Sequence, residues 1–240
     1  MGNELSREMT NRLIHEMREG IYAKSDRLPP EVELAQQMGI SRTMVRDCLS
    51  ILEREGFINR KHGVGTIVNH QVLNVCTRMD LEKEFLNMVT DAGYVSKIAA
   101  CDYKKIAADK DIAKRLKIKV GDMVYETWRL ITADGRPAIY CLDYIAVDLI
   151  KKEVYSEDLL KKPIFVFLEE VCGQQVSMDI TEVRAVAADC FLSERLQVAK
   201  GAPLLYMDEI GYEFFGNPVL YSREYYVDGI LNHILIRKKI

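Results

Sequence analysis

The segment from residue 28 to residue 68 constrains the fold more than any other part of this chain. It reads LPPEVELAQQMGISRTMVRDCLSILEREGFINRKHGVGTIV. Gly39 suits the left-handed position that closes a helix, and Ser41 is a good N-cap for the next one. The spacing of a buried helical face then recurs at Val45, Cys48, Leu49 and Leu52. The pattern predicts two short helices joined by a tight turn.

A hairpin is predicted directly after these helices. Phe57 and Ile58 begin one strand, and Thr66 to Val68 form its partner. The basic stretch between them, residues 60–65, contains glycines that allow the backbone to approach a phosphate closely. Two helices followed by such a wing predict a winged helix-turn-helix.

Basic residues lie where a DNA duplex would meet this motif. Arg42, Thr43 and Arg46 fall on the outward face of the second helix, opposite its apolar stripe. The first residues of that helix enter the major groove in helix-turn-helix proteins, where an arginine can bond guanine O6 and N7 together. We therefore predict DNA contacts from these three residues and from the wing residues Arg60, Lys61, His62 and Gly63.

The alternative for Arg42 and Arg46 is that they are ordinary solvated charges on a surface helix. Their placement about one turn apart, directly after a Gly-x-Ser turn, favours the DNA role. The first 70 residues hold ten Lys and Arg against ten Asp and Glu, so the predicted domain is not basic as a whole. DNA affinity would then depend on the local patch and the phosphates that it neutralises.

The start of the chain, MGNELSREMTNRLIHEM, predicts a charged amphipathic helix with Met9, Leu13 and Met17 on its inner face. It lacks the apolar core of a secretory signal, and no apolar run is long enough to span a membrane. The six cysteines form no C-x-x-C pair, so we interpret them as reduced packing residues of a cytoplasmic protein without a metal site.

An internal repeat dominates the second half of the chain. Arg115-Leu116, Gly121, Gly135 to Pro137 and Tyr140 are matched by Arg195-Leu196, Gly201, Gly216 to Pro218 and Tyr221. Each copy predicts a short helix, a strand, a glycine-containing hairpin and a returning strand. Two such copies indicate one pseudo-symmetric antiparallel sheet, and a further helix is predicted from Leu81, Phe85 and Val89 to Gly93.

The expected fold class is therefore α+β, in two domains, as the length of 240 residues also suggests. We place a winged helix-turn-helix at residues 1–69, a connector at 70–80 and an antiparallel-sheet domain at 81–240.

The first domain resembles the DNA-binding domain of the GntR family of bacterial transcription regulators. The matching motifs are Leu28–Ala35, Gly39–Arg46, Glu55–Phe57 and Gly63–Thr66. One departure is Val32, which stands where the family usually carries an arginine that commonly contacts DNA. The resemblance implies a DNA-binding regulator whose operator preference differs from that of its relatives.

The second domain resembles the UTRA effector-binding domain of the HutC-type branch of this family. The match covers Leu116 to Pro137 and Gly201 to Leu205. It implies a chorismate-lyase-like sheet that binds a small metabolite, a homodimer, and a near-palindromic DNA operator. We accordingly expect a ligand-responsive repressor that needs no cofactor and is not an enzyme.

The resemblance also points to effector-binding residues. Arg129 keeps the first arginine of the R-x-R pattern of phosphosugar-sensing relatives, but Ile131 replaces the second. The predicted effector site comprises Arg129, Tyr140, Phe165, Glu224 and Tyr226. It would suit a compact, partly apolar molecule with one carboxylate. The alternatives are cross-strand packing for Tyr140 and an ordinary ion pair of Arg129 with Asp143 or Glu224.

A lyase-like enzyme joined to a DNA-binding domain is the competing function. The sequence contains no G-x-S-x-G, P-loop or H-E-x-x-H motif, and its four histidines, at 15, 62, 70 and 233, are widely spaced. A third hypothesis is an architectural DNA-binding protein with a purely dimerising second domain.

Overall fold

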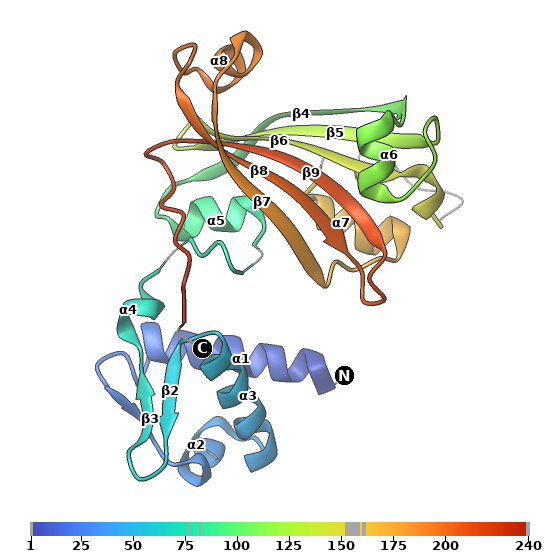
Figure 1. Ribbon diagram of the computed structural model, residues 1–240. Helices are drawn as coiled ribbons and strands as arrows, with labels where there is room; N and C mark the ends of the chain where they lie inside the picture. Colours follow the sequence, from blue (N-terminus) through green and yellow to red (C-terminus); the bar gives the residue numbers. More distant parts are fainter. Residues whose placement is uncertain (1, 76, 82, 152–158, 160–161, 239–240) are drawn as a thin grey trace. The chain divides into compact units, whose positions relative to one another are not determined.

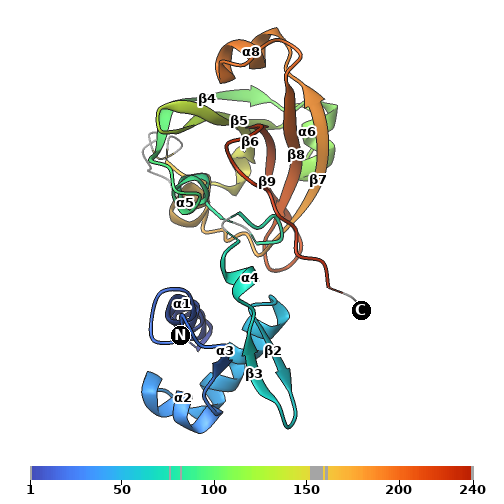
Figure 2. The same cartoon turned by 90° about the vertical axis from the view of Figure 1, so that its left-hand side faces the viewer.

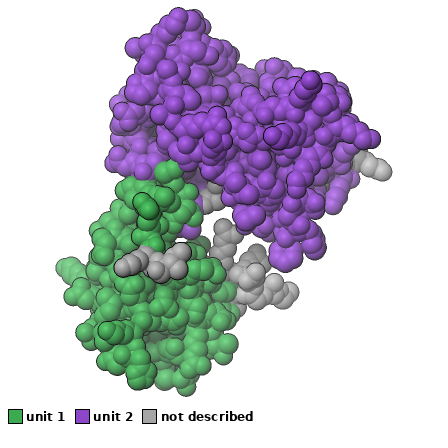
Figure 3. Space-filling view, in the orientation of Figure 1, with its two compact units in different colours: residues 1–80, 234–240 green, residues 81–233 purple. Residues whose placement is uncertain are grey.

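The computed structural model describes residues 2–75, 77–81, 83–151, 159 and 162–238. The chain divides into two compact units (Figure 3). Unit 1 contains the residues up to Asp80 together with the segment from Ile234, and unit 2 runs from Leu81 to His233. No helix of the described residues is both long and apolar enough to cross a membrane, and these residues contain no cluster of side chains suited to a metal ion.

Unit 1 is the predicted winged helix-turn-helix (Figure 1). Its helices are α1 (Gly2–Arg18), α2 (Glu31–Met38), α3 (Arg42–Arg54) and α4 (His70–Leu73), and its strands are β1 (Arg27–Leu28), β2 (Ile58–Lys61) and β3 (Gly65–Val68). The strands form an antiparallel sheet in the order β1-β3-β2.

The local signals of the helix-turn-helix act as predicted. Gly39 closes α2 at φ 70°, a left-handed conformation. The hydroxyl of Ser41 accepts a hydrogen bond from the Met44 amide at 3.2 Å and so caps α3. The predicted stripes of α1 and α3 are buried in one core: Met9, Leu13, Met17, Val45, Cys48, Leu49 and Leu52.

The wing differs in detail from the expectation. Arg60 and Lys61 lie within β2, opposite Thr66 and Gly65, so the turn is shorter than predicted. Strand β1 adds to β3 through only two residues, which carry too little local pattern to be recognised. The predicted connector contains the one-turn helix α4.

The end of the chain belongs to unit 1, although the sequence placed it in the second domain. Ile234 pairs with Arg78 in a parallel bridge, and its amide and carbonyl bond to Thr77 and Met79 at 2.9 and 3.0 Å. Further on, the Lys238 ammonium donates to the carbonyls of Glu53 and Arg54 at the end of α3, at 2.6 and 2.8 Å. The sequence gives no local sign of this long-range contact.

Unit 2 is built on one antiparallel sheet of six strands in the order β4-β5-β6-β9-β8-β7. The strands are β4 (Ser96–Ala107), β5 (Met123–Ala133), β6 (Arg136–Ala146), β7 (Met178–Ala187), β8 (Pro203–Tyr212) and β9 (Pro218–Val227). The helical segments are α5 (Phe85–Asp91), α6 (Lys110–Leu116), η1 (Val147–Leu149), α7 (Ile164–Phe167), η3 (Leu168–Cys172) and α8 (Cys190–Leu196).

The predicted repeat is visible as a pseudo-twofold arrangement about the central pair β6 and β9. Tyr140 and Tyr144 of the first repeat correspond to Tyr221 and Tyr225 of the second. Tyr140 lies opposite Tyr225, and Tyr144 lies opposite Tyr221, so the repeat relates one pair to the other. The helices match too: the side chains of Asp109 and Asp189 cap α6 and α8. Each repeat also begins with an outer strand, β4 or β7, which the sequence analysis missed because none of the residues of these edge strands is buried.

The two faces of the sheet carry different helices. Odd-numbered residues of β5 and β6, such as Tyr125 and Ile145, pack against α7 and η3. Even-numbered residues, such as Tyr140 and Tyr144, pack against α8 and α6. Figure 2 shows α5 and α6 on opposite sides of the sheet. This division decides which side chains can reach a common cavity.

Candidate DNA-binding surface and effector cavity

The start of α3 presents the predicted base-reading residues to solvent. Arg42 and Thr43 are exposed on its first turn. Arg46, one turn further along, is also exposed, and its Nε lies 2.7 Å from a carboxylate oxygen of Glu31 in α2. The ion pair holds the Arg46 side chain along the surface. DNA would therefore have to compete with Glu31 for the guanidinium group.

The tip of the wing is exposed and rich in glycine. Lys61, His62 and Gly63 are all exposed, and the Val64 amide closes the turn on the Lys61 carbonyl at 3.0 Å. Gly63 and Gly65 have φ values of 78° and 101°. No neighbouring atom would meet a side chain at either position, so the backbone conformation is what requires glycine there.

Arg60 is turned back onto α3 instead of toward the tip. Its amide and Nε donate to the Glu53 carboxylate at 3.0 and 2.8 Å, and its Nη2 donates to the Ser50 hydroxyl at 3.2 Å. Partial burial raises the pKa of Glu53, but the bonds and charge of Arg60 outweigh it and hold this pKa below its ordinary value. Arg60 therefore fixes the wing against the helix.

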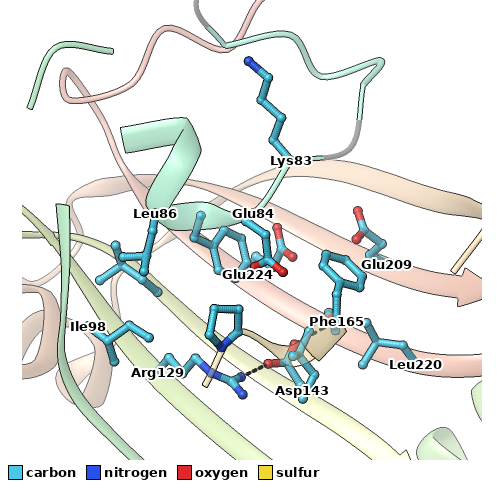
Figure 4. A pocket seen from close by; sticks show the side chains of 15 residues that line it. Lys83, Glu84, Leu86, Ile98, Arg129, Asp143, Phe165, Glu209, Leu220 and Glu224 are labelled. Atoms are coloured by element: carbon cyan, nitrogen blue, oxygen red, sulfur yellow. Dashed lines mark hydrogen bonds and ion pairs between the residues drawn. The ribbon is translucent and has the colours of Figure 1, made fainter. Parts of the chain in front are cut away.

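Unit 2 contains a cavity of about 450 Å³, its opening included, between the sheet and the segments around α5 and α7 (Figure 4). Apolar and charged side chains share its wall: Lys83, Glu84, Phe85, Leu86, Ile98, Arg129, Ile131, Asp143, Pro163, Ile164, Phe165, Glu209, Leu220, Ser222 and Glu224. Such a mixture of apolar walls and a few polar groups is typical of a small-molecule site.

Arg129 is almost fully buried in the wall of this cavity, at 2% exposure. Its Nη1 lies 2.5 Å from Asp143 Oδ2 and 3.1 Å from the Thr127 hydroxyl. Its Nε and Nη2 both donate to the carbonyl of Lys162, at 2.9 and 2.6 Å. The Ser222 hydroxyl donates to the other oxygen of Asp143 at 2.7 Å. The pair thus has the internal hydrogen bonds that a buried ion pair needs.

Burial shifts the acidity of several carboxyl groups in unit 2. It raises the pKa of Glu84 to about 7, although the nearby charge of Arg129 acts in the opposite direction. Burial also raises the pKa of Glu209, against a hydrogen bond of 2.5 Å from the Thr181 hydroxyl. On the adjoining strand, burial raises the pKa of Asp179 to about 6. These groups are harder to ionise than ordinary carboxyls.

The structure brings together some of the predicted effector residues. Arg129, Phe165 and Glu224 line the cavity. Tyr226 lies beside it, where its hydroxyl donates to Glu224 at 2.5 Å and its ring meets Phe85 edge-on. Tyr140 lies on the opposite face of the sheet, because neighbouring side chains on a strand alternate, and it packs against α8. Its ring also lies beside those of Trp128 and Tyr225 on the neighbouring strands, which is the cross-strand packing given above as the alternative for Tyr140.

Sequence reasoning did not identify Glu84 and Glu209 as cavity residues. The repeat contained the signal for Glu209: it lies on β8 at the position that Arg129 occupies on β5, 80 residues earlier. In the same way Glu224 on β9 is the counterpart of Asp143 on β6. Glu84 lies outside the repeat, so only the fold of its segment over the sheet shows its place.

A winged helix-turn-helix joined to a sheet domain that contains a cavity is the architecture of a one-component transcription regulator. Comparison with known families agrees: the model for bacterial regulatory proteins of the gntR family matches residues 5–68, and the UTRA domain model matches residues 91–228. The chain belongs to the GntR family of bacterial regulators and carries a UTRA domain.

Individual relatives are distant but extend over most of the chain. The HTH-type transcriptional regulator GmuR of Bacillus subtilis is 24% identical over 221 residues, which cover 91% of this chain and 90% of the relative. The repressor NagR of the same species is 26% identical over 83% of this chain and 80% of its own length. These relatives are transcriptional regulators, not enzymes, which argues against the lyase-like alternative.

The fold as a whole resembles a solved structure. The crystal structure of the possible transcriptional regulator YydK from Bacillus subtilis aligns with a TM-score of 0.77 at 19% identity, covering 97% of this chain and 99% of that one. At this identity the likeness establishes the fold alone.

Proposed function

We propose that this regulator is a cytoplasmic repressor that binds a near-palindromic operator as a homodimer and responds to a small metabolite held in the cavity of unit 2. One observation carries the proposal: an exposed basic helix start beside a glycine-containing wing occurs in the same chain as a buried, partly charged cavity. The first can read DNA and the second can hold a ligand.

DNA contact is assigned to the exposed groups on α3 and at the wing tip. Arg42, Thr43 and Arg46 would meet base edges or phosphates, and Lys61, His62 and Gly63 would lie along the backbone or the minor groove. Arg60 would support the wing and meet DNA only after leaving Glu53.

Dimer formation is assigned to unit 2. Its edge strand β7 exposes several apolar side chains, namely Met178, Ile180 and Val183. An open edge strand with apolar residues is a common site of association. A second copy would cover it and present two DNA-binding units to half-sites about one helical turn apart.

A ligand can change operator affinity only through a difference in its binding to two states of the protein, typically worth about 1–3 kcal/mol. The cavity is a suitable place because it lies between the rigid sheet and the short segments around α5 and α7. The metabolite would favour the state with the lower operator affinity, so its presence would relieve repression.

The proposal is tested by titrating the full chain onto a duplex that carries the region upstream of its own gene, at several salt concentrations. A steep loss of affinity with salt and a change on adding metabolites are expected. Light scattering measures the molar mass in solution and so tests whether the protein is a dimer. No binding to the duplex at low ionic strength, with or without metabolites, would overturn the proposed function.

A further inference from the structure

Among the residues that the structure describes, the two cations of the cavity wall are each paired with a carboxylate. Arg129 forms its ion pair with Asp143 at 2.5 Å and also donates to the Thr127 hydroxyl and the Lys162 carbonyl. Lys83 lies 2.7 Å from Asp91 in an ion pair. Figure 4 shows the Lys83 side chain pointing away from the other labelled side chains. Neither cation is positioned to receive an anionic ligand.

Two further carboxylates of the described wall, Glu84 and Glu209, lie outside these two ion pairs. Glu84 comes from the segment before α5, and Glu209 comes from β8, with Glu224 on the neighbouring strand β9. The bond to Glu209 comes from the uncharged hydroxyl of Thr181, which does not cancel its charge. Phe165 contributes an aromatic ring to the same wall (Figure 4).

We propose that the effector of this regulator is a cation, a small molecule with a protonated amine or a substituted ammonium group next to an apolar portion. The inference rests on the proposed effector function of the cavity. The ammonium would lie between the carboxylates of Glu84 and Glu209, against the ring of Phe165, and the apolar portion would contact Leu86, Ile98 and Leu220. A cation over an aromatic face is attracted to the ring, the more so when it is desolvated.

Electrostatics disfavours the reverse assignment. An anion in this space would face Glu84 and Glu209, whose ionised forms would repel it and whose protonated forms would have to be retained for it to bind. It would also have to draw Arg129 away from Asp143 and leave a buried carboxylate unpaired, which is costly. The partly apolar carboxylate expected from the sequence therefore fits the cavity less well than an amine does.

The acidity of the wall agrees with this assignment. Several charged groups surround Glu84 and Glu209: Arg129 on β5, Asp143 on β6, Glu169 on η3, Asp179 on β7, Glu224 on β9 and Lys83 beside Glu84. Since the pKa of Glu84 is about 7 and that of Glu209 is raised, a bound cation would favour the ionised forms. Binding near neutral pH would then release protons.

The test measures binding of charge-matched probes to the full chain by calorimetry and thermal shift. One set is benzylamine, benzyl alcohol and benzoate, and a second is n-butylamine, 1-butanol and butyrate. We expect the amine of at least one set to bind most tightly and the carboxylate not to bind. Calorimetry in buffers of different ionisation enthalpy should show that amine binding releases protons at pH 7.

Variants locate the binding. Glu84→Gln and Glu209→Gln should each weaken amine binding about tenfold, or about 1.4 kcal/mol, and leave the alcohol unchanged. Glu194→Gln, at an exposed position on α8, is the matched control and should bind as the unchanged protein does.

The inference is overturned if carboxylates bind as tightly as amines, if none of the six probes binds, or if the Glu84 and Glu209 variants bind the amines unchanged. None of these results would contradict the proposed function, because the operator titration with a broad metabolite panel tests that function separately. If an anion from that panel releases the protein from the operator, the proposed regulator function is supported and only the proposal of a cationic effector is wrong.

Discussion

At the scale of single residues, the contacts of arginines decide their roles. Arg42, Arg46 and Arg60 look alike in the sequence, yet Arg42 is exposed, Arg46 pairs with Glu31 on the surface, and Arg60 is held by Glu53. Arg129 in unit 2 is also neutralised by the protein, because it pairs with Asp143 on the neighbouring strand. Sequence patterns could place these residues on the correct elements, but they could not show which charges the protein itself neutralises.

Replacing Arg42 or Arg46 by alanine should weaken operator binding by about 1–3 kcal/mol each if they read bases. The loss should be smaller for Arg46, because in the unchanged protein this side chain must give up its ion pair with Glu31 before it can meet DNA. Mobility-shift titration measures the change. Arg54→Ala is the matched control, since Arg54 is exposed at the other end of the same helix. Unchanged affinity and salt slope in both variants would remove α3 as the reading helix.

Glu84 should make the stability of unit 2 depend on pH. Its folded pKa of about 7 lies above the ordinary value of 4.5, so the folded state binds the proton more tightly than the unfolded state. The stabilisation is complete below pH 4.5 and is lost as the pH rises through 7. We expect Glu84→Gln to reduce the fall in melting temperature between pH 5 and pH 8. An identical pH profile for Glu84→Gln and Glu194→Gln would contradict this.

At the scale of elements, the sequence predicted those elements that have local signals. Ser41 and Gly39 mark the ends of α3 and α2, and the repeated glycines mark the two hairpins of the sheet. Elements defined by distant partners were missed: β1, the two edge strands β4 and β7, and the C-terminal segment that bonds to residues 77–79. These strands bury few or none of their side chains, so their sequences lack the strong apolar pattern of the central strands.

The C-terminal segment should stabilise the DNA-binding unit through Lys238. Its ammonium meets the last carbonyls of α3, where a cation is favoured by the helix dipole by about 0.3–1 kcal/mol. Lys238→Met should lower the stability of unit 1 by about this amount. Lys238→Arg should largely restore it. Hydrogen exchange of the α3 amides is the measurement, and equal protection in all three proteins would show that the contact contributes nothing.

At the scale of the whole molecule, the chain crosses between the two units twice, at residues 80–81 and at residues 233–234. A sheet with its own buried clusters on both faces suggests that unit 2 can fold without unit 1. Unit 2 is therefore joined to the DNA-binding unit at both ends of its own segment.

Residues 81–233 expressed alone should therefore give a folded protein with a cooperative melting transition. Its circular dichroism should be dominated by strand, and light scattering should show a dimer if β7 supplies the interface. A monomer would assign dimer formation to another surface. A protein without a cooperative transition would show that unit 2 depends on the rest of the chain.

By itself the sequence determined the two-part organisation, the winged helix-turn-helix, the repeated sheet and the outward basic residues of α3. These follow from periodicity, caps and turn residues, which act over a few positions. Only the tertiary structure decided that Tyr140 lies away from the cavity, that Arg129 is paired with Asp143, and that Glu84 and Glu209 share one wall. The reason is that charge pairing and burial depend on residues brought together from strands and helices far apart in the chain.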